Sequence, residues 1–123
     1  MPISVRKGDL PVETMGDYES RSSELEEFTV SFESTPAGFA PPRELFKGLP
    51  GDACPCPHWG YLVKGEHRIT FVDGTVETIR AGEAYYIRPG HWFESVTDSE
   101  AIEFSPSGEL QRTVEVVQRN MGG

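Results

Sequence analysis

The sequence predicts an all-β fold, a small antiparallel barrel or sandwich with a short helix at its C-terminal end. Short alternating apolar runs recur between residues 25 and 106, and turns containing Gly or Pro separate them. Apolar residues at helical spacing occur only near the end of the chain. With 123 residues, the chain has the length of one domain. We therefore expect 25–106 to form a single barrel and 107–123 to form a C-terminal helix and tail.

The N-terminal part is polar and then changes to a strand pattern. The segment ETMGDYESRSSEL contains more capping and turn residues than core residues, so we expect 1–24 to form an extended arm or short edge strands. The next segment, ELEEFTVSFES, places Phe28, Val30 and Phe32 on one face, as in a half-buried strand. The Pro- and Gly-rich stretch TPAGFAPPRELFKGLPGDA that follows has the length of a functional or mobile loop.

The second half of the chain contains further short strands. HRITFVDGTVETI predicts a hairpin, because Asp-Gly at 73–74 favours a type I′ turn with positive φ at both positions. RAGEAYYIRPGHWFESV predicts a turn at Gly82, a tyrosine-rich strand and a turn at 88–90. SEAIEFS predicts a last strand with Ile102 and Phe104 on one face.

The C-terminal helix is predicted from its start signals and its periodicity. Ser105 could cap the helix and Pro106 suits its first position. Leu110, Val114 and Val117 then recur at helical spacing, which predicts an apolar face packed on the barrel.

Composition and charge exclude several classes of protein. The hydrophobic content of 37% is that of a globular protein, and no apolar run approaches the roughly 20 residues of a membrane span. The opening MPISVRKGDLPVE lacks the apolar region of a secretory signal, so we expect a cytoplasmic protein without a membrane partner. Twenty Asp and Glu against eleven Lys and Arg give a net charge of −9, which argues against nucleic acid as a partner.

The segment ACPCPHWG carries both cysteines and one of the three histidines at alternate positions. Both cysteines precede proline, which favours extended backbone, so Cys54, Cys56 and His58 are expected on the same side. Thiolate and imidazole are ligands that zinc prefers, and iron, nickel or copper to a lesser degree. On a straight strand Cys54 and His58 would lie about 13 Å apart. Either the chain bends here, or only two neighbouring residues bind one ion.

His91, after the turn at 88–90, is the expected further ligand. We predict a divalent metal site, zinc by ligand softness with iron or nickel as alternatives, formed by Cys54, Cys56, His58 and His91. Three protein ligands would leave a position for water with a pKa near 7, whereas four would make a closed, structural site. The alternative is that both cysteines fill a reduced core and His58 is hydrogen-bonded at the rim.

Aromatic residues near this site could form an apolar pocket for a small-molecule ligand. Together with a turn arginine that could hold an anion, the predicted substrate pocket comprises Trp59, Tyr61, Tyr86, Arg88, Trp92 and Phe93. Packing in the core or a dimer interface is the alternative for the aromatic residues, and plain exposure is the alternative for the arginine. Glu94 is expected as a solvated rim charge, and His67 is expected at the surface.

From about Asp52 to Pro106 the sequence resembles the cupin superfamily, specifically a small single-domain bacterial cupin. GYLVKGE is similar to the end of the first cupin motif, and AGEAYYIRPGHWFESV is similar to the second. The resemblance implies a double-stranded antiparallel β-barrel, or jelly roll, that forms a homodimer. It also implies one divalent metal held by three histidines and a glutamate, although fold does not fix function.

The usual ligands of that family are absent from their usual positions. Its His-x-His falls on Asp52 and Cys54, its glutamate on His58 and its later histidine on Phe93. We interpret Cys-x-Cys-x-His as a variant of the first motif.

Three functions are consistent with this pattern. The first is a metal-binding cupin that binds or acts on a small molecule, with zinc or iron supplying the chemistry if the protein is an enzyme. The second is a metal-free binding or sensing cupin, and the third is a thiol switch at Cys54 and Cys56. The sequence names no substrate and assigns no catalytic residue.

Overall fold

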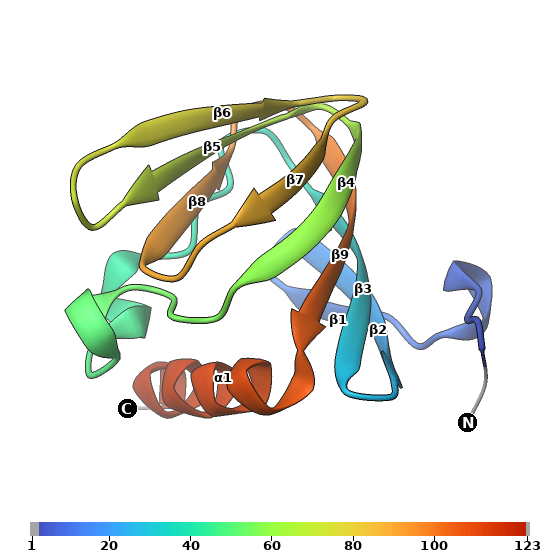
Figure 1. Cartoon of the computed structure of the whole chain (residues 1–123), viewed down its shortest axis with the longest axis horizontal. Coiled ribbons are helices and arrows are strands. Elements are labelled where there is room, and N and C mark those ends of the chain that lie inside the picture. The colour runs from blue at the N-terminus through green and yellow to red at the C-terminus, as the bar shows by residue number, and fades with distance from the viewer. Residues whose placement is uncertain (1–2, 123) are drawn as a thin grey trace.

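The computed structural model describes residues 3–122 and consists of two antiparallel sheets with one C-terminal helix (Figure 1). The larger sheet has the order β1-β2-β3-β9-β4-β7, and the smaller has the order β6-β5-β8. The elements are β1 Glu13–Met15, β2 Tyr18–Leu25, β3 Phe28–Thr35, β4 His58–Lys64, β5 Glu66–Phe71, β6 Val76–Arg80, β7 Ala84–Ile87, β8 His91–Ser95, β9 Ser99–Pro106 and α1 Ser107–Gly122. The prediction of an all-β jelly-roll barrel with a C-terminal helix is confirmed.

The apolar core lies between the two sheets. Its buried members are Leu62, Ile69, Phe71, Ile79, Ile87 and Ala101, with Tyr85 and Phe93 packed against them. Strands β4 and β5 contribute to it through alternation, since His58 and Leu62 point inward from β4, and His67, Ile69 and Phe71 are the buried positions of β5. Positions 1, 2 and 123 of the predicted arm and tail lie outside the described residues.

The hairpin at Asp73–Gly74 forms with a different turn from the one predicted. Only Gly74 has positive φ, at 90°, whereas Asp73 does not. The N–H of Gly74 donates to the carbonyl of Phe71, and the N–H of Phe71 donates to the carbonyl of Thr75. This is a type I turn followed by a glycine bulge. The Asp73 carboxylate accepts hydrogen bonds from the N–H and hydroxyl of Thr75, at 2.9 and 2.6 Å, which favours this geometry over a type I′ turn.

Helix α1 begins at Ser107, after the predicted start. Ser105 and Pro106 belong to β9, because they pair with Thr29 and Phe28 of β3. The helix lies across one end of the two sheets, beside the 3₁₀ turn at Arg43–Phe46 (Figure 1). The Asn120 side chain fastens it there by donating to the carbonyls of Leu45 and Lys47. Among residues 3–122, no helix is long and apolar enough to cross a membrane.

Strands β3 and β9 direct their glutamates toward the interior and expose part of their apolar faces. Glu33 and Glu103 face the interior cavity described below, whereas Phe28 and Phe104 are 38% and 37% exposed on the opposite face of the sheet. Val30, on the same face as Phe28, is nevertheless only 2% exposed, in line with a half-buried strand. The inner face of both strands borders a mainly apolar cavity that the two glutamates make partly polar.

Candidate metal site and adjoining cavity

The chain bends between Cys54 and His58, so that their side chains meet. The Sγ atom of Cys54 lies 3.7 Å from Nε2 of His58. Pro55 and Pro57 have no N–H to pair with a neighbouring strand, and β4 begins only at His58. The segment before β4 therefore lies outside the sheet and is free to turn toward the barrel interior.

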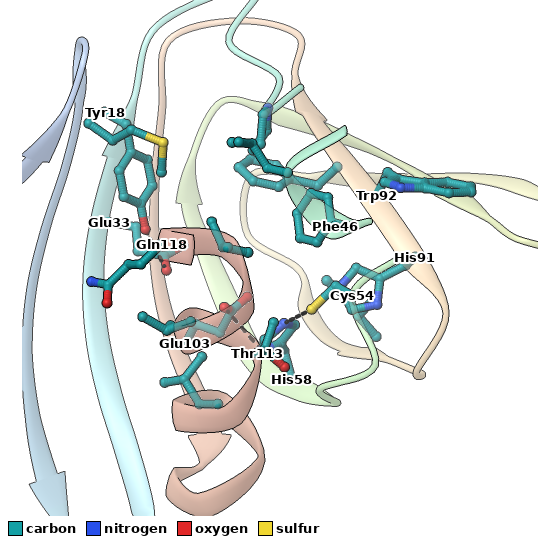
Figure 2. Close-up of a pocket in the computed structure, with 18 of the residues that line it drawn as sticks. Tyr18, Glu33, Phe46, Cys54, His58, His91, Trp92, Glu103, Thr113 and Gln118 are labelled. Atoms are coloured by element: carbon teal, nitrogen blue, oxygen red, sulfur yellow. Dashed lines mark hydrogen bonds and ion pairs between the residues drawn. The ribbon is translucent and has the colours of Figure 1, made fainter. Parts of the chain in front are cut away.

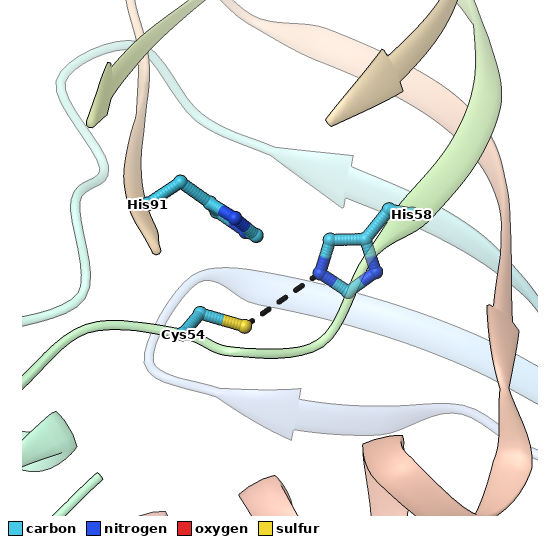
Figure 3. Close-up of side chains that lie close together, drawn as sticks. All are labelled: Cys54, His58 and His91. Carbon is cyan, nitrogen blue, oxygen red and sulfur yellow. Dashed lines mark hydrogen bonds between the residues drawn. The ribbon is translucent and has the colours of Figure 1, made fainter. Parts of the chain in front are cut away.

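His91 is brought to the same place by backbone pairing. An isolated antiparallel bridge joins Cys54 and His91, and the N–H of Cys54 donates to the carbonyl of His91 at 3.0 Å. Paired residues of antiparallel strands present their side chains to the same face. The ligand-type atoms of Cys54, His58 and His91 consequently lie within 4.8 Å of one another, and all three residues are buried (Figure 3).

Both imidazoles are oriented by a partner on their Nδ1 atoms. His91 Nδ1 donates to the carbonyl of Arg88 at 2.8 Å, which leaves its Nε2 with a free electron pair. His58 Nδ1 lies 2.7 Å from Oγ of Ser105 and 3.4 Å from Oε2 of Glu103. Such partners fix the ring orientation and tautomer of metal-binding histidines.

Burial sets the protonation states of the cluster. Desolvation lowers the pKa of His58 to about 4, and it lowers the pKa of His91 to about 4 with a further contribution from His58. Both rings are therefore neutral at pH 7, as metal ligands must be. Desolvation raises the pKa of the Cys54 thiol to about 11, so this thiol is protonated until a cation replaces its proton.

The donor set and its spacing fit a zinc ion. Zn–S and Zn–N bonds of about 2.3 and 2.0 Å at tetrahedral angles place sulfur and nitrogen about 3.5 Å apart. The observed 3.7 Å between Cys54 Sγ and His58 Nε2 is close to this separation. One thiol and two imidazoles are donors that zinc accepts, and three protein ligands leave a fourth position for water or a ligand.

Cys56 does not join this cluster. Its side chain is buried, and Sγ lies 3.5 Å from the carbonyl oxygen of Pro57. Desolvation, with a contribution from Cys54, raises the pKa of Cys56 to about 12. The predicted same-side arrangement of Cys54, Cys56 and His58 fails, because the bend before β4 breaks the alternation of a straight strand. The structure brings together three of the four predicted ligands.

A cavity of about 380 Å³ adjoins the three-residue cluster (Figure 2). Its lining is mainly apolar. Helix α1 contributes Leu110, Val114, Val117 and Met121, and the Pro- and Gly-rich loop contributes Pro41, Leu45 and Phe46. Cys54, His58 and His91 belong to the same lining, so a group bound in the cavity would reach the cluster directly.

Several solved structures share this architecture, although comparison of the sequence alone finds no match. No protein-family model matches the sequence, and no curated protein matches it. An RmlC-like cupin from Shewanella frigidimarina superposes with a TM-score of 0.60 at 17% identity, over 83% of this chain and 88% of that one. Ectoine synthase from P. lautus superposes with a TM-score of 0.61 at 15% identity, over 85% of this chain and 78% of that one.

The chain has a cupin fold. A mutant of oxalate decarboxylase from Bacillus subtilis gives a TM-score of 0.63 at 16% identity, over 81% of this chain but only 28% of that longer one. At these identities the likeness shows the fold alone.

Within the cupin fold, the predicted pocket residues divide into two groups. Trp92 and Phe93 line the cavity. Trp59 and Tyr61 do not, because alternation along β4 turns them outward, and they are 42% and 46% exposed. Tyr86 pairs with Trp59 on the same outer face, with ring centroids 5.1 Å apart.

Arg88 also lies away from the cavity that adjoins the cluster. Its guanidinium lies over the ring of Phe71 and forms ion pairs with Asp73 and Glu77. Glu94 is paired with Arg68 at the surface, in line with its predicted rim position. Arg88, predicted as part of the substrate pocket, therefore does not line this cavity.

Sequence reasoning missed the polar half of the cavity. Glu33, Glu103, Tyr18 and His67 line it. His67, expected at the surface, is 5% exposed. The alternation in HRITF, with Ile69 and Phe71 buried, was a signal for its inward position. Glu33 and Glu103 gave no such signal, because a glutamate opposite an apolar strand face is typical of a solvated surface.

Proposed function

We propose that this protein is a metal-binding cupin in which Cys54, His58 and His91 hold one divalent ion, zinc by preference, beside a cavity that receives a small molecule. The observation that supports it is the convergence of one thiol and two pre-oriented imidazoles within 4.8 Å. In this proposal Cys-x-Cys-x-His replaces the first cupin motif and supplies Cys54 and His58 as ligands. Cys56 serves as a buried neighbour.

The protein groups have separate tasks in this site. Ser105 and the carbonyl of Arg88 hold the two rings with their Nε2 atoms available for a cation. The apolar side chains of α1 offer a wall against which the body of a small molecule can pack. A zinc ion bound by three protein ligands would supply Lewis acidity and a water of lowered pKa. Binding, and no particular reaction, is what the geometry supports.

Cobalt substitution tests the ligand set. Co²⁺ bound by a thiolate gives a charge-transfer absorption band that cobalt bound only by nitrogen and oxygen lacks. Titration of the metal-free protein with Co²⁺ should produce this band in the wild type and in Cys56→Ala, and should not produce it in Cys54→Ala. A band that survives in Cys54→Ala and disappears in Cys56→Ala would refute the proposed ligands.

The size of the cavity supports a second candidate, the metal-free binding cupin. A volume of about 380 Å³ lies within the range of small-molecule sites even without an ion. This candidate predicts no cobalt or zinc binding, together with a ligand that raises the melting temperature equally in the wild type and Cys54→Ala.

A further inference from the structure

Two carboxylates lie in the part of the cavity away from His91. Tyr18 and Glu33 lie on the side of the cavity opposite His91 and Trp92, with Glu103 between them and His58 (Figure 2). Glu33 and Glu103 come from adjacent strands. Because Ser31 pairs with Glu103 in the register of β3 and β9, Glu33 is the diagonal neighbour of Glu103 on the same face. Both carboxylates therefore point into one space.

The hydrogen bonds of these carboxylates come from neutral donors. Tyr18 donates its hydroxyl to Glu33 Oε2 at 3.0 Å, and Tyr85 donates to Glu103 Oε1 at 2.8 Å. Among residues 3–122, no Lys or Arg forms an ion pair with either carboxylate, and no Lys or Arg lines the cavity. Ionising these two acids in an apolar cavity without a protein cation is costly unless a ligand supplies positive charge.

His67 adds a third acceptor to the lining. Ser95 donates its hydroxyl to the carbonyl of Thr97, and Thr35 donates its hydroxyl to Ser95. The Thr35 hydroxyl has thus used its proton and can only accept from Nε2 of His67, which lies 3.5 Å away. His67 therefore has its proton on Nε2, and its Nδ1 is an acceptor. None of the side-chain hydrogen bonds found within residues 3–122 involves this Nδ1. His67 is only 5% exposed, and it lines the cavity.

We propose that the cavity binds a small amphipathic amine, with its ammonium group at Glu33 and Glu103 and its apolar body against α1. The proposal deepens the proposed function and rests on it only in taking this cavity as the ligand site. The ammonium provides the donors and the charge that the two carboxylates require when they are ionised. Leu110, Val114 and Val117 offer an apolar wall that a bare inorganic cation would leave unused.

Matched probes test the class of ligand without any mutation. Phenethylamine, phenethyl alcohol and hydrocinnamate share an aromatic body and differ in their charged or neutral end. Calorimetric titration of the wild-type protein at pH 7 should show the amine binding at least tenfold more tightly than the alcohol, with the carboxylate weakest. Equal affinity for amine and alcohol, or no binding of the amine, would overturn the proposal.

Two variants separate this inference from the metal site. Glu33→Gln should weaken phenethylamine binding by about tenfold and change alcohol binding less than twofold. Cys54→Ala, which removes a proposed metal ligand, should keep the preference for the amine. Absence of metal binding from the wild type with the amine preference intact would refute the proposed metal site alone. Metal binding in the wild type without an effect of Glu33→Gln on the amine would refute the amine site alone.

Discussion

The hydroxyl of Tyr85 lies 2.8 Å from Oε1 of Glu103, and the hydrogen bond between them crosses strand β4 at Gly60. Gly60 pairs with both residues, one on each side, and a Cβ atom added to it would lie 2.5 Å from the Tyr85 ring and 2.6 Å from the carbonyl oxygen of Ile102. Because Gly60 has no side chain, the phenol of Tyr85 on β7 can pass β4 and reach the carboxylate of Glu103 on β9. The φ of Gly60 is not positive, so this close approach, and not the backbone conformation, is what requires a glycine here.

Gly60→Ala should therefore destabilise the protein by about 2 to 4 kcal/mol, because the clash includes backbone that cannot move aside. Urea unfolding measures the change. Gly8→Ala is the matched control, since a Cβ at Gly8 meets nothing within 4 Å, and it should change stability by less than about 0.5 kcal/mol. Similar stabilities for the two variants would contradict the role of Gly60.

Ser105→Ala should weaken zinc binding by about tenfold or more. The Ser105 hydroxyl lies 2.7 Å from Nδ1 of His58 and orients the ring toward Cys54. Competition against a chelator of known affinity measures the change. Circular dichroism should show that the secondary structure of the variant is unchanged. An unchanged zinc affinity would show that Ser105 does not position the ring.

The stability of the metal-free protein should pass through a maximum near pH 6.5. Burial lowers the pKa values of His58, His67 and His91 to about 4 from 6.5. Between these values the unfolded chain binds more protons, so the imidazoles reduce stability as the pH falls from about 6.5 to about 4. Their full contribution is present above pH 6.5.

The two cavity carboxylates change stability with pH in the opposite direction to the imidazoles. Burial and the charge of Glu103 raise the pKa of Glu33 to about 8, and burial raises that of Glu103 to about 7, both from 4.5. The folded state then binds more protons, so stability falls as the pH rises from about 4.5 to about 8. Three imidazoles outweigh two carboxylates below pH 6.5, and only the carboxylates act above it.

Urea unfolding of chelator-treated protein between pH 4 and 9 measures this profile. Glu33→Gln should flatten the alkaline side and make the rise between about pH 4.5 and 6.5 steeper, because Glu33 opposes the imidazoles in that range. A stability that continues to rise between pH 6.5 and 8 would contradict the assigned shifts.

Formation of the expected homodimer should bury the outer face of the larger sheet. Trp59 pairs with Phe104 on one side and Tyr86 on the other, and all three are 37–55% exposed. An apolar row of this kind on a chain of net charge −9 is typical of an interaction surface. Light scattering should give the mass of two chains for the wild type and one for Trp59→Lys. Val76→Lys, on an exposed position of β6, should remain dimeric, and a monomeric wild type would refute the prediction.

Sequence patterns predicted the elements of the cupin fold well and the direction of some of their faces poorly. Turns at Gly82 and Gly90 and the Asp-Gly hairpin are local features, and each appears with positive φ at its glycine. The inward direction of Glu33 and Glu103 depends on a cavity that only the packed sheets and α1 create. Local alternation cannot distinguish a filled core from such a cavity.

The candidate metal site, too, could be predicted only in part from the sequence. Residue chemistry was enough to select Cys54, His58 and His91. The separation of Cys56 from them depends on the bend before β4 and on the backbone bridge between Cys54 and His91, which joins segments distant in sequence. Spacing along the chain contains no information on either feature.

The central claim is tested most directly by the zinc content per chain of three proteins purified without chelators: wild type, Cys54→Ala and Cys56→Ala. Elemental analysis should find about one zinc per chain in the wild type and in Cys56→Ala, and almost none in Cys54→Ala. The absence of metal from the wild type, even after reconstitution with zinc and iron under reducing conditions, would contradict the account.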